Sequence, residues 1–391
     1  MRRFRKFFLY AIGILVGLCF LLTAALAIGN LRLPQRSPVI DTLSEGDKVR
    51  LAETLHLREQ VGEAVWPGWS TADIPAILYN EEYAFLTGYP DPPDGWVKVP
   101  QGIQRGSAWE SVPNDGFAGQ TYYRQRLSDP ELTPEAFTVM VGDRWVSSMP
   151  TLDWFRIGLS NQIREDLPAF LRPVFPYQIF IGQLVSGSDH YISLSAHEAF
   201  HSFQGRMAPQ KLAGAELVNQ FEKDYPWDDL ALQADWQTEL DVLAEALRST
   251  DRAQTLDLVR EFLALRASRR DSAALSPELI SYEQNREWLE GLARYAELEI
   301  WRQASTGGYV PVPEAADLDD FGDYAGFERR WSQELDQISR MANDEGNGRF
   351  YYTGMAQAYL LDQIFPEWKL QAFNDNIWLE ELLTDVIQAG Q

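Results

Sequence analysis

The stretch Ser195–Phe203 (SAHEAFHSF) holds two of the four histidines in the 391-residue chain, with a glutamate between them. On a helix, positions i and i+4 lie on the same face, so His197 and His201 can present two imidazole nitrogens to one metal ion. Glu198 follows His197 by roughly 100° around the helix, beside the open coordination position of such a metal. This H-E-x-x-H pattern predicts a zinc site, with Glu198 placed to take a proton from bound water.

The residues around the two histidines also predict a buried helix, because Leu194 and the other positions of the stretch are uncharged. Buried histidines need polar partners. The alternative to a metal site is therefore a core helix whose histidines hydrogen-bond to neighbouring backbone groups.

Composition places the chain among folded proteins with a substantial core. It is 45% hydrophobic and 13% aromatic, and its length suits one large or two modest domains. Without the four basic residues among the first six, 30 basic side chains remain against 57 acidic ones, a net charge of −27. Such a body repels nucleic acid and anionic lipid, and we expect no nucleic-acid partner.

The N-terminus predicts a membrane anchor over residues 1–30. Four of the first six residues are basic, and no charge occurs from Phe7 to Ile28, which is long enough for one membrane-spanning helix. The basic flank is expected to stay in the cytoplasm and the rest of the chain outside it. A secretory signal cleaved near Ala25–Ala27 is the alternative. The single cysteine, Cys19, lies inside this segment, which excludes disulfides and cysteine ligands from the exported part.

The remaining chain predicts an α+β protein in three parts. Residues 31–70 carry helical spacing and are expected to link the anchor to the body as a helical stalk. Residues 71–212 are expected to form a mixed sheet that ends in the histidine helix, and residues 213–391 an α-helical part. Strands are predicted at Ala76–Tyr79, Thr121–Leu127 and Phe175–Val185, and a hairpin joins Phe137–Val141 to Arg144–Val146 through Gly142–Asp143.

A catalytic zinc requires three protein ligands and one open position. No histidine follows His201, so the third ligand must be a carboxylate. Glu283, Glu287 and Glu290 stand at i, i+4 and i+7, on one face of a predicted helix, where they should repel one another unless a positive charge faces them. The alternative is an exposed acidic stripe offset by nearby arginines, and spacing alone does not choose between Glu287 and Glu290.

Two segments downstream of the histidines resemble the aminopeptidase N family of gluzincins. Trp288–Glu297 (WLEGLARYAE) is similar to the family segment W-L-N-E-G-F-A-x-Y-x-E, and Tyr351–Gly354 (YYTG) to its Y-x-K-G. With H-E-x-x-H, the three segments occur in the family's order. The sequence departs from the family in the longer spacing after His201, in one residue missing before Glu290 and in Thr353 at the lysine position. The family's G-x-M-E-N segment is absent.

The resemblance implies a zincin-like fold with one zinc ion held by His197, His201 and Glu290. It also implies that Tyr351, with Tyr352 as the fallback, donates its hydroxyl to the oxyanion of the transition state. We attribute the glycine after Glu290 to close packing against the zinc helix. Glu287 is then expected to orient the second ring nitrogen of a ligand histidine.

These features together predict an anchored, extracytoplasmic zinc metallopeptidase that hydrolyses a peptide or protein substrate, with Glu198 as general base. His190 is placed on a polar loop, where it either donates to an oxyanion or is only a surface residue. One rival interpretation is an anchored binding or scaffolding protein that has lost turnover. The other is a purely structural envelope domain with an accidental motif.

Overall fold

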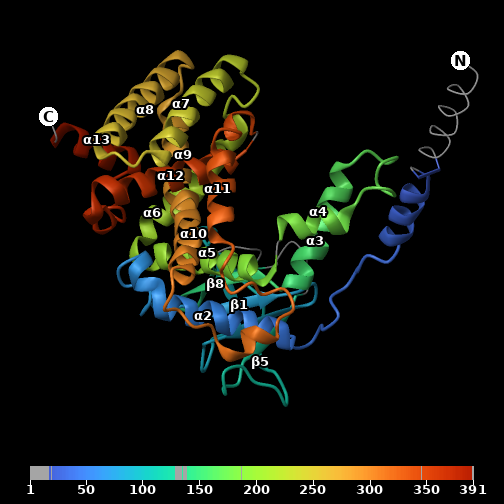
Figure 1. The fold of residues 1–391 in the computed structure, drawn as a ribbon. Helices are drawn as coiled ribbons and strands as arrows, with labels where there is room; N and C mark the ends of the chain where they lie inside the picture. Colours follow the sequence, from blue (N-terminus) through green and yellow to red (C-terminus); the bar gives the residue numbers. More distant parts are fainter. Residues whose placement is uncertain are drawn as a thin grey trace, which may run out of the picture.

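A curled mixed sheet supports the N-terminal half of the protein, and helices make up nearly all of the C-terminal half (Figure 1). The computed structural model describes residues 17–18, 20–127, 134, 139–185, 187–344 and 346–389. The predicted α+β class and the mixed sheet are confirmed. In the described ranges no helix is both long and apolar enough to cross a membrane. Residues 1–16 and 19 of the predicted anchor lie outside those ranges.

The sheet has eight strands in the order β4-β3-β7-β8-β1-β2-β6-β5 across the described residues. β1 runs parallel to β8, with Ile77 opposite Ser148, and the other neighbouring pairs are antiparallel. The strands are β1 (Ala76–Tyr79), β2 (Tyr83–Thr87), β3 (Trp96–Lys98), β4 (Gln104–Arg105), β5 (Glu110–Ser111), β6 (Tyr123–Arg126), β7 (Val139–Val141) and β8 (Arg144–Pro150).

Three sequence predictions about strands are confirmed. β1 has the predicted bounds, β6 lies within the segment predicted at Thr121–Leu127, and β7 and β8 form the hairpin predicted around Gly142. Gly142 has φ +60°, a conformation that a two-residue hairpin turn requires and that glycine adopts without strain. Residues 137 and 138 of the predicted hairpin lie outside the described ranges.

Residues 213–391 are mostly helical, as predicted, and several helices begin at residues suited to a helix start. Ser44, Asp229, Asp251 and Ser276 cap α2, α7, α8 and α9 through their side-chain oxygens. The helices are α2 (Glu45–Val65), α3 (Leu152–Asp166), α4 (Tyr177–Leu184), α5 (Gly187–Met207), α6 (Pro209–Leu217), α7 (Leu230–Arg248), α8 (Arg252–Ser272), α9 (Pro277–Arg286), α10 (Leu292–Ser305), α11 (Phe327–Ile338), α12 (Gly348–Ile364) and α13 (Leu379–Ala389). A π-helical turn, η3 (Glu287–Gly291), joins α9 to α10, and short 3-10 turns are η2 (Val218–Asp224), η4 (Pro313–Asp317), η5 (Met341–Asn343) and η6 (Pro366–Leu370).

One large hydrophobic core joins the histidine helix α5 to the C-terminal helices. It runs from Leu57 and Val65 on α2, through Phe200 on α5, to Leu383 on α13, all of which are buried. The expectation that residues 31–70 form a stalk is therefore wrong for α2. Leu57 and Val65 belong to the same core as the histidine helix, and Leu51 packs with Leu78 of β1 in a second buried cluster, because burial there removes their apolar surface from water.

The segment Phe175–Val185, predicted as a strand, is the helix α4 instead. Its short apolar run has no alternation that would separate a strand from a buried helix, and tertiary packing decides between them. Tyr177 and Ile181, four residues apart, pack with Leu33 in a small core of their own. The residue between them, Ile179, is exposed, which fits a helix, whereas on a strand it would lie on the same face as the buried pair.

Two glycines bring α12 into backbone contact with η3. A Cβ on Gly354 would lie 2.3 Å from the carbonyl oxygen of Glu287, and a Cβ on Gly291 would lie 2.4 Å from the Cα of Gly354. Gly291 thus faces α12, and the expectation that it packs against the histidine helix is wrong. The contact joins the two segments that resemble the gluzincin motifs and fixes where α12 crosses the π-turn.

Replacing Gly354 with alanine should destabilise the protein by about 1–3 kcal/mol, because the new Cβ meets backbone atoms that cannot rotate away. Gly214 in α6 is the matched control, since no atom of the described residues lies within 4 Å of a Cβ built there. Gly214→Ala should leave stability unchanged or raise it by about 0.5–1 kcal/mol. Urea denaturation followed by circular dichroism measures both, and equal effects would contradict the packing argument.

Candidate metal centre

Helix α5 presents the two motif histidines to one point, as its sequence spacing predicts. The Nε2 atoms of His197 and His201 lie 3.1 Å apart, and both side chains are buried. Ring centroids are 4.8 Å apart with the planes at 82°, so the two nitrogens converge although the rings do not stack. Two lone-pair nitrogens directed at one position form half of a tetrahedral metal site.

Glu290 supplies the third group of this cluster. Its Oε2 lies 3.3 Å from His201 Nε2 and 3.6 Å from His197 Nε2. The other carboxylate oxygen, Oε1, accepts a hydrogen bond of 2.5 Å from Arg286 Nη2. Burial would raise the pKa of Glu290, but Arg286 and His201 hold that pKa well below its usual value. The carboxylate is therefore ionised, with one oxygen occupied and the other facing the histidines.

The three groups fit a divalent cation. One donor atom from each of His197, His201 and Glu290 lies within 4.8 Å of the others, and the three side chains are buried. Together with Glu198 and Glu297 the cluster contains three carboxylates, and Glu198 Oε2 has no hydrogen-bond partner among the described residues. Burying negative charge without a partner costs several kcal/mol. A bound cation would remove this cost, and two imidazoles with one carboxylate form a common catalytic zinc set.

Glu297 orients His197 from the side opposite the cluster. Its Oε2 lies 3.3 Å from His197 Nδ1, and its Oε1 accepts from Arg294. Burial lowers the pKa of His197, but Glu290 and Glu297 outweigh this effect and raise it to about 10. A carboxylate behind a metal-binding histidine fixes the ring and its tautomer. This role of Glu297 was not predicted from the sequence, although Glu297 follows Glu290 by two helical turns and lies on the same face.

Gln204 plays the corresponding part for His201, and it too was not identified from the sequence. Its Oε1 lies 2.9 Å from His201 Nδ1, and its Nε2 donates to the carbonyls of Trp288 and Leu289 at 2.9 and 3.2 Å. Because these carbonyls belong to η3, Gln204 connects the ring of one histidine to the π-turn that carries Glu290. Gln204 follows His201 by three residues, a spacing that makes the two side chains neighbours on a helix and could have indicated this contact.

Glu287 is not near the histidines, and the prediction that it orients a ligand histidine is wrong. Its carboxylate accepts from Arg266 at 2.6 and 2.8 Å and from Gln357 at 2.8 Å. The prediction assumed an uninterrupted α-helix, in which Glu287 and Glu290 share a face. A π-turn rotates the chain less per residue, which separates the two side chains around the axis.

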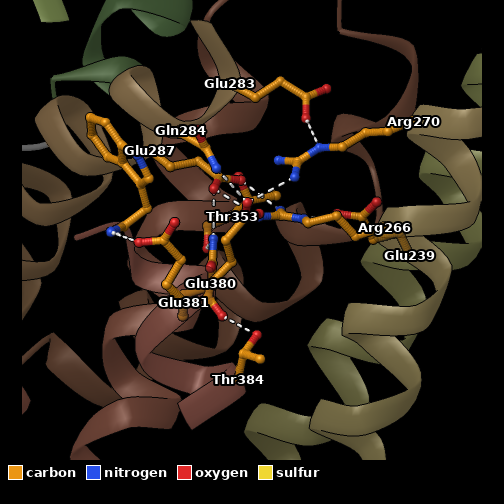
Figure 2. A network of polar contacts seen from close by, with 12 residues as sticks. Glu239, Arg266, Arg270, Glu283, Gln284, Glu287, Thr353, Glu380, Glu381 and Thr384 are labelled. Atoms are coloured by element: carbon orange, nitrogen blue, oxygen red, sulfur yellow. Dashed lines mark hydrogen bonds and ion pairs between the residues drawn. The ribbon is translucent and has the colours of Figure 1, made fainter. Parts of the chain in front are cut away.

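A network of buried ion pairs holds the side chains that turn away from the metal centre (Figure 2). Arg266 also pairs with Glu239 at 2.9 Å, and Arg270 pairs with Glu283 at 2.7 Å. Glu380 on α13 accepts from both arginines, at 2.9 and 2.8 Å. The acidic stripe of the sequence analysis thus divides, with Glu283 and Glu287 facing arginines and Glu290 facing the histidines.

Glu198 lies on the side of α5 that faces the sheet. It lines a cavity of about 20 Å³ together with Ser147 on β8 and Arg58 on α2, which is room for one water molecule. Burial raises the pKa of Glu198, and the two motif histidines oppose this effect. A half-buried carboxylate with a raised pKa is suited to accept and return a proton near neutral pH.

Tyr351, and not Tyr352, lies beside the histidines. The rings of Tyr351 and His197 are nearly parallel, at 12°, with centroids 6.0 Å apart. Burial and the charge of Glu290 raise the pKa of Tyr351 well above its usual value, so the hydroxyl keeps its proton. The neighbouring Tyr352 faces the guanidinium of Arg294, at 5.9 Å from its ring centroid.

His190 belongs to α5 and is buried, so its predicted place on a polar loop is wrong. The helix begins at Gly187, so His190 lies in its first turn. His190 lies two turns before His197, about 10 Å along the axis, and its Nε2 is 3.4 Å from Arg330 Nη2. Burial and Arg330 lower its pKa to about 4, so it is neutral at pH 7. It is too far along the helix to join the metal cluster.

Comparison with known proteins identifies no family for this chain, because no family model, curated protein or solved structure matches it.

Glu290→Ala should abolish metal binding, whereas Glu287→Ala should leave the metal content unchanged. The first variant removes an oxygen from the cluster, and the second removes one of the three carboxylates that pair with Arg266. Loss of that charged hydrogen bond should lower stability by about 1–3 kcal/mol. Metal analysis of both purified variants, with circular dichroism as the folding control, tests this pair. Equal metal content in the two variants, or the reverse order, would show that Glu290 is not a ligand.

Glu297→Gln should weaken metal affinity by roughly 10–100-fold without abolishing binding, because the ligand histidine loses a charged partner and keeps its position. Glu299→Gln provides a matched control on the same helix, since Glu299 is buried but pairs with Arg302. Competition with a chromogenic chelator measures both affinities. An unchanged affinity in Glu297→Gln would contradict the orienting role.

Proposed function

We propose that this protein is a zinc-dependent peptidase whose metal is held by His197, His201 and Glu290. The observation that carries the proposal is the convergence of these three donor groups beside Glu198, whose Oε2 is buried without a hydrogen-bond partner among the described residues. Two imidazoles and one carboxylate leave one coordination position open for water or substrate. A structural zinc site would instead have four protein ligands.

Within this proposal, each nearby side chain has a defined part. A zinc ion bound there would lower the pKa of a water molecule and polarise the carbonyl of the scissile peptide bond. Glu198 accepts a proton from the water molecule as the water oxygen attacks the carbonyl carbon. It then transfers that proton to the leaving nitrogen as the carbon–nitrogen bond breaks. Tyr351 donates its hydroxyl to the carbonyl oxygen as negative charge develops there.

We further propose that the chain is anchored by its N-terminal apolar segment, with the peptidase part outside the cytoplasm. The support is in the sequence, where four basic residues precede an uncharged run from Phe7 to Ile28. The substrate would then be a peptide or protein of that compartment. The strong negative charge of the body disfavours nucleic acid as a partner.

The proposal is tested by measuring bound zinc in the purified full chain and by incubating it with a broad peptide library, with and without a chelator. We expect about one zinc ion per chain and peptide cleavage that the chelator removes and added zinc restores. Zinc without any cleavage would favour the anchored binding or scaffolding protein. Absence of bound metal, together with failure to take up zinc, would overturn the proposal.

Glu198→Gln should abolish peptide cleavage and leave zinc bound, because the substitution removes the base without touching a ligand. Zinc content and library cleavage are measured on the same preparation. Cleavage at the wild-type rate would rule out Glu198 as the general base.

Tyr351→Phe should lower turnover on the order of 100-fold or more, with little change in substrate binding, because one oxyanion donor is lost. Tyr352→Phe makes the same chemical change one residue away, at a ring that faces Arg294, and should cleave normally. Steady-state kinetics on the best library peptide separate kcat from KM. Equal kcat values for the two variants would exclude the role of Tyr351.

A further inference from the structure

Exposed apolar side chains are concentrated on one side of the protein. Eleven of the seventeen large apolar residues that are exposed in the described part of the chain fall within residues 18–31 and 170–184. The others are scattered singly, which is normal for a protein surface. The second segment, with its five exposed residues, is the loop between α3 and α4 and the outer face of α4, here named the hairpin surface: Phe170, Leu171, Ile179, Phe180 and Leu184.

The hairpin surface is exposed because α4 has apolar residues on both of its faces. Tyr177 and Ile181 face inward, while Ile179 and Phe180 lie on the outer face, followed one turn later by Leu184. Ile179 is 62% exposed and Phe180 is 42% exposed. A short helix on a soluble domain would normally have polar residues on its outer face, so this face points to a partner that is itself apolar.

The charge of this segment differs from that of the rest of the chain. Residues 167–188 contain no acidic side chain and one basic one, Arg172, although the whole sequence has 57 acidic residues in 391. Arg172 donates to the backbone carbonyls of Glu165 and Leu167, at the start of the loop. This segment therefore adds no negative charge of its own to the repulsion between the acidic body and an anionic surface.

The hairpin surface lies beside the N-terminal apolar segment. The side chain of Asn30, directly after that segment, donates to the carbonyls of Pro173 and Phe175 at 2.9 and 2.8 Å. Leu33 then packs with Tyr177 and Ile181 on the inner face of α4. Figure 1 shows α3, α4 and the blue N-terminal segment together on one side, away from α7, α8 and α13. The uncharged run Phe7–Ile28 thus ends next to an exposed apolar hairpin.

We propose that the hairpin surface inserts into the interfacial region of the lipid bilayer, next to the N-terminal apolar segment. A bilayer is the occupant that the neighbouring sequence favours, because that segment is long enough to enter one and ends at this hairpin. Phe170 and Phe180 provide apolar bulk of the kind that enters the headgroup boundary, and Arg172 provides a positive charge at that level. Two attachments would fix the orientation of the body relative to the membrane, which one attachment alone cannot do.

The experiment places a fluorophore on the hairpin surface of the full chain in vesicles. Cys19→Ser removes the only cysteine, and Ile179→Cys provides a site for an environment-sensitive dye. Leu230→Cys is the matched control, because Leu230 is 78% exposed and belongs to α7, a helix that Figure 1 shows away from α3 and α4. Each protein is reconstituted in phosphatidylcholine vesicles with or without lipids that carry a nitroxide near the headgroup.

The dye at position 179 should shift to shorter wavelength and lose emission with the nitroxide lipid, and the dye at position 230 should show neither change. Adding Phe180→Asp should reduce the quenching at position 179, because a charge on the outer face of α4 opposes insertion. Absence of quenching at position 179 would overturn the proposal. A blue shift that depends on protein concentration but not on nitroxide would instead identify a second copy of the chain as the occupant. These outcomes do not depend on peptidase activity.

Discussion

The backbone contact between Gly291 and Gly354 is the constraint on which the candidate site depends. Side chains at these positions would push α12 away from the π-turn, since each added Cβ would lie within 3 Å of backbone atoms. With the helices in contact, α12 carries Tyr351 to the ring of His197. The same turn places Glu290 beside the histidines. One close helix crossing therefore assembles groups that lie more than 60 residues apart.

Charge balance is the second requirement of this core, because acidic side chains are buried on both sides of the π-turn. Glu283 and Glu287 pair with arginines of α8 and can be buried without a metal. The carboxylates near the histidines have fewer cations, since Arg286 pairs with Glu290 and Arg294 is shared between Glu297 and Glu334. A divalent cation would complete the charge balance there. We therefore interpret Glu290 as a metal ligand, and Glu283 and Glu287 as ion-pair partners of arginines.

The proposed zinc site and the proposed membrane contact lie on different parts of the fold, and α5 connects them. Helix α5 begins three residues after α4 ends, and it carries the motif histidines from its third turn onward. A hairpin held at the bilayer would therefore fix the direction of the zinc helix relative to the membrane. Each proposal starts from an energetically unfavourable feature. In the zinc site it is buried negative charge, and at the membrane contact it is exposed apolar surface.

The sequence alone predicted what depends on local spacing. The i, i+4 histidines, the β7–β8 turn at Gly142 and the amphipathic C-terminal helices follow from the 3.6- and 2-residue periods and from turn chemistry. It also predicted Glu290, through a resemblance. Only the tertiary structure decided that the segment Phe175–Val185 forms a helix and that Glu287 faces Arg266. It also decided that Gly291 contacts Gly354. The contacts of Glu297 and Gln204 with the two histidines were likewise fixed only by the tertiary structure. A short apolar run fits either period, a π-turn changes the phase of a helix without a clear sequence signal, and a partner across a helix interface is fixed only by packing.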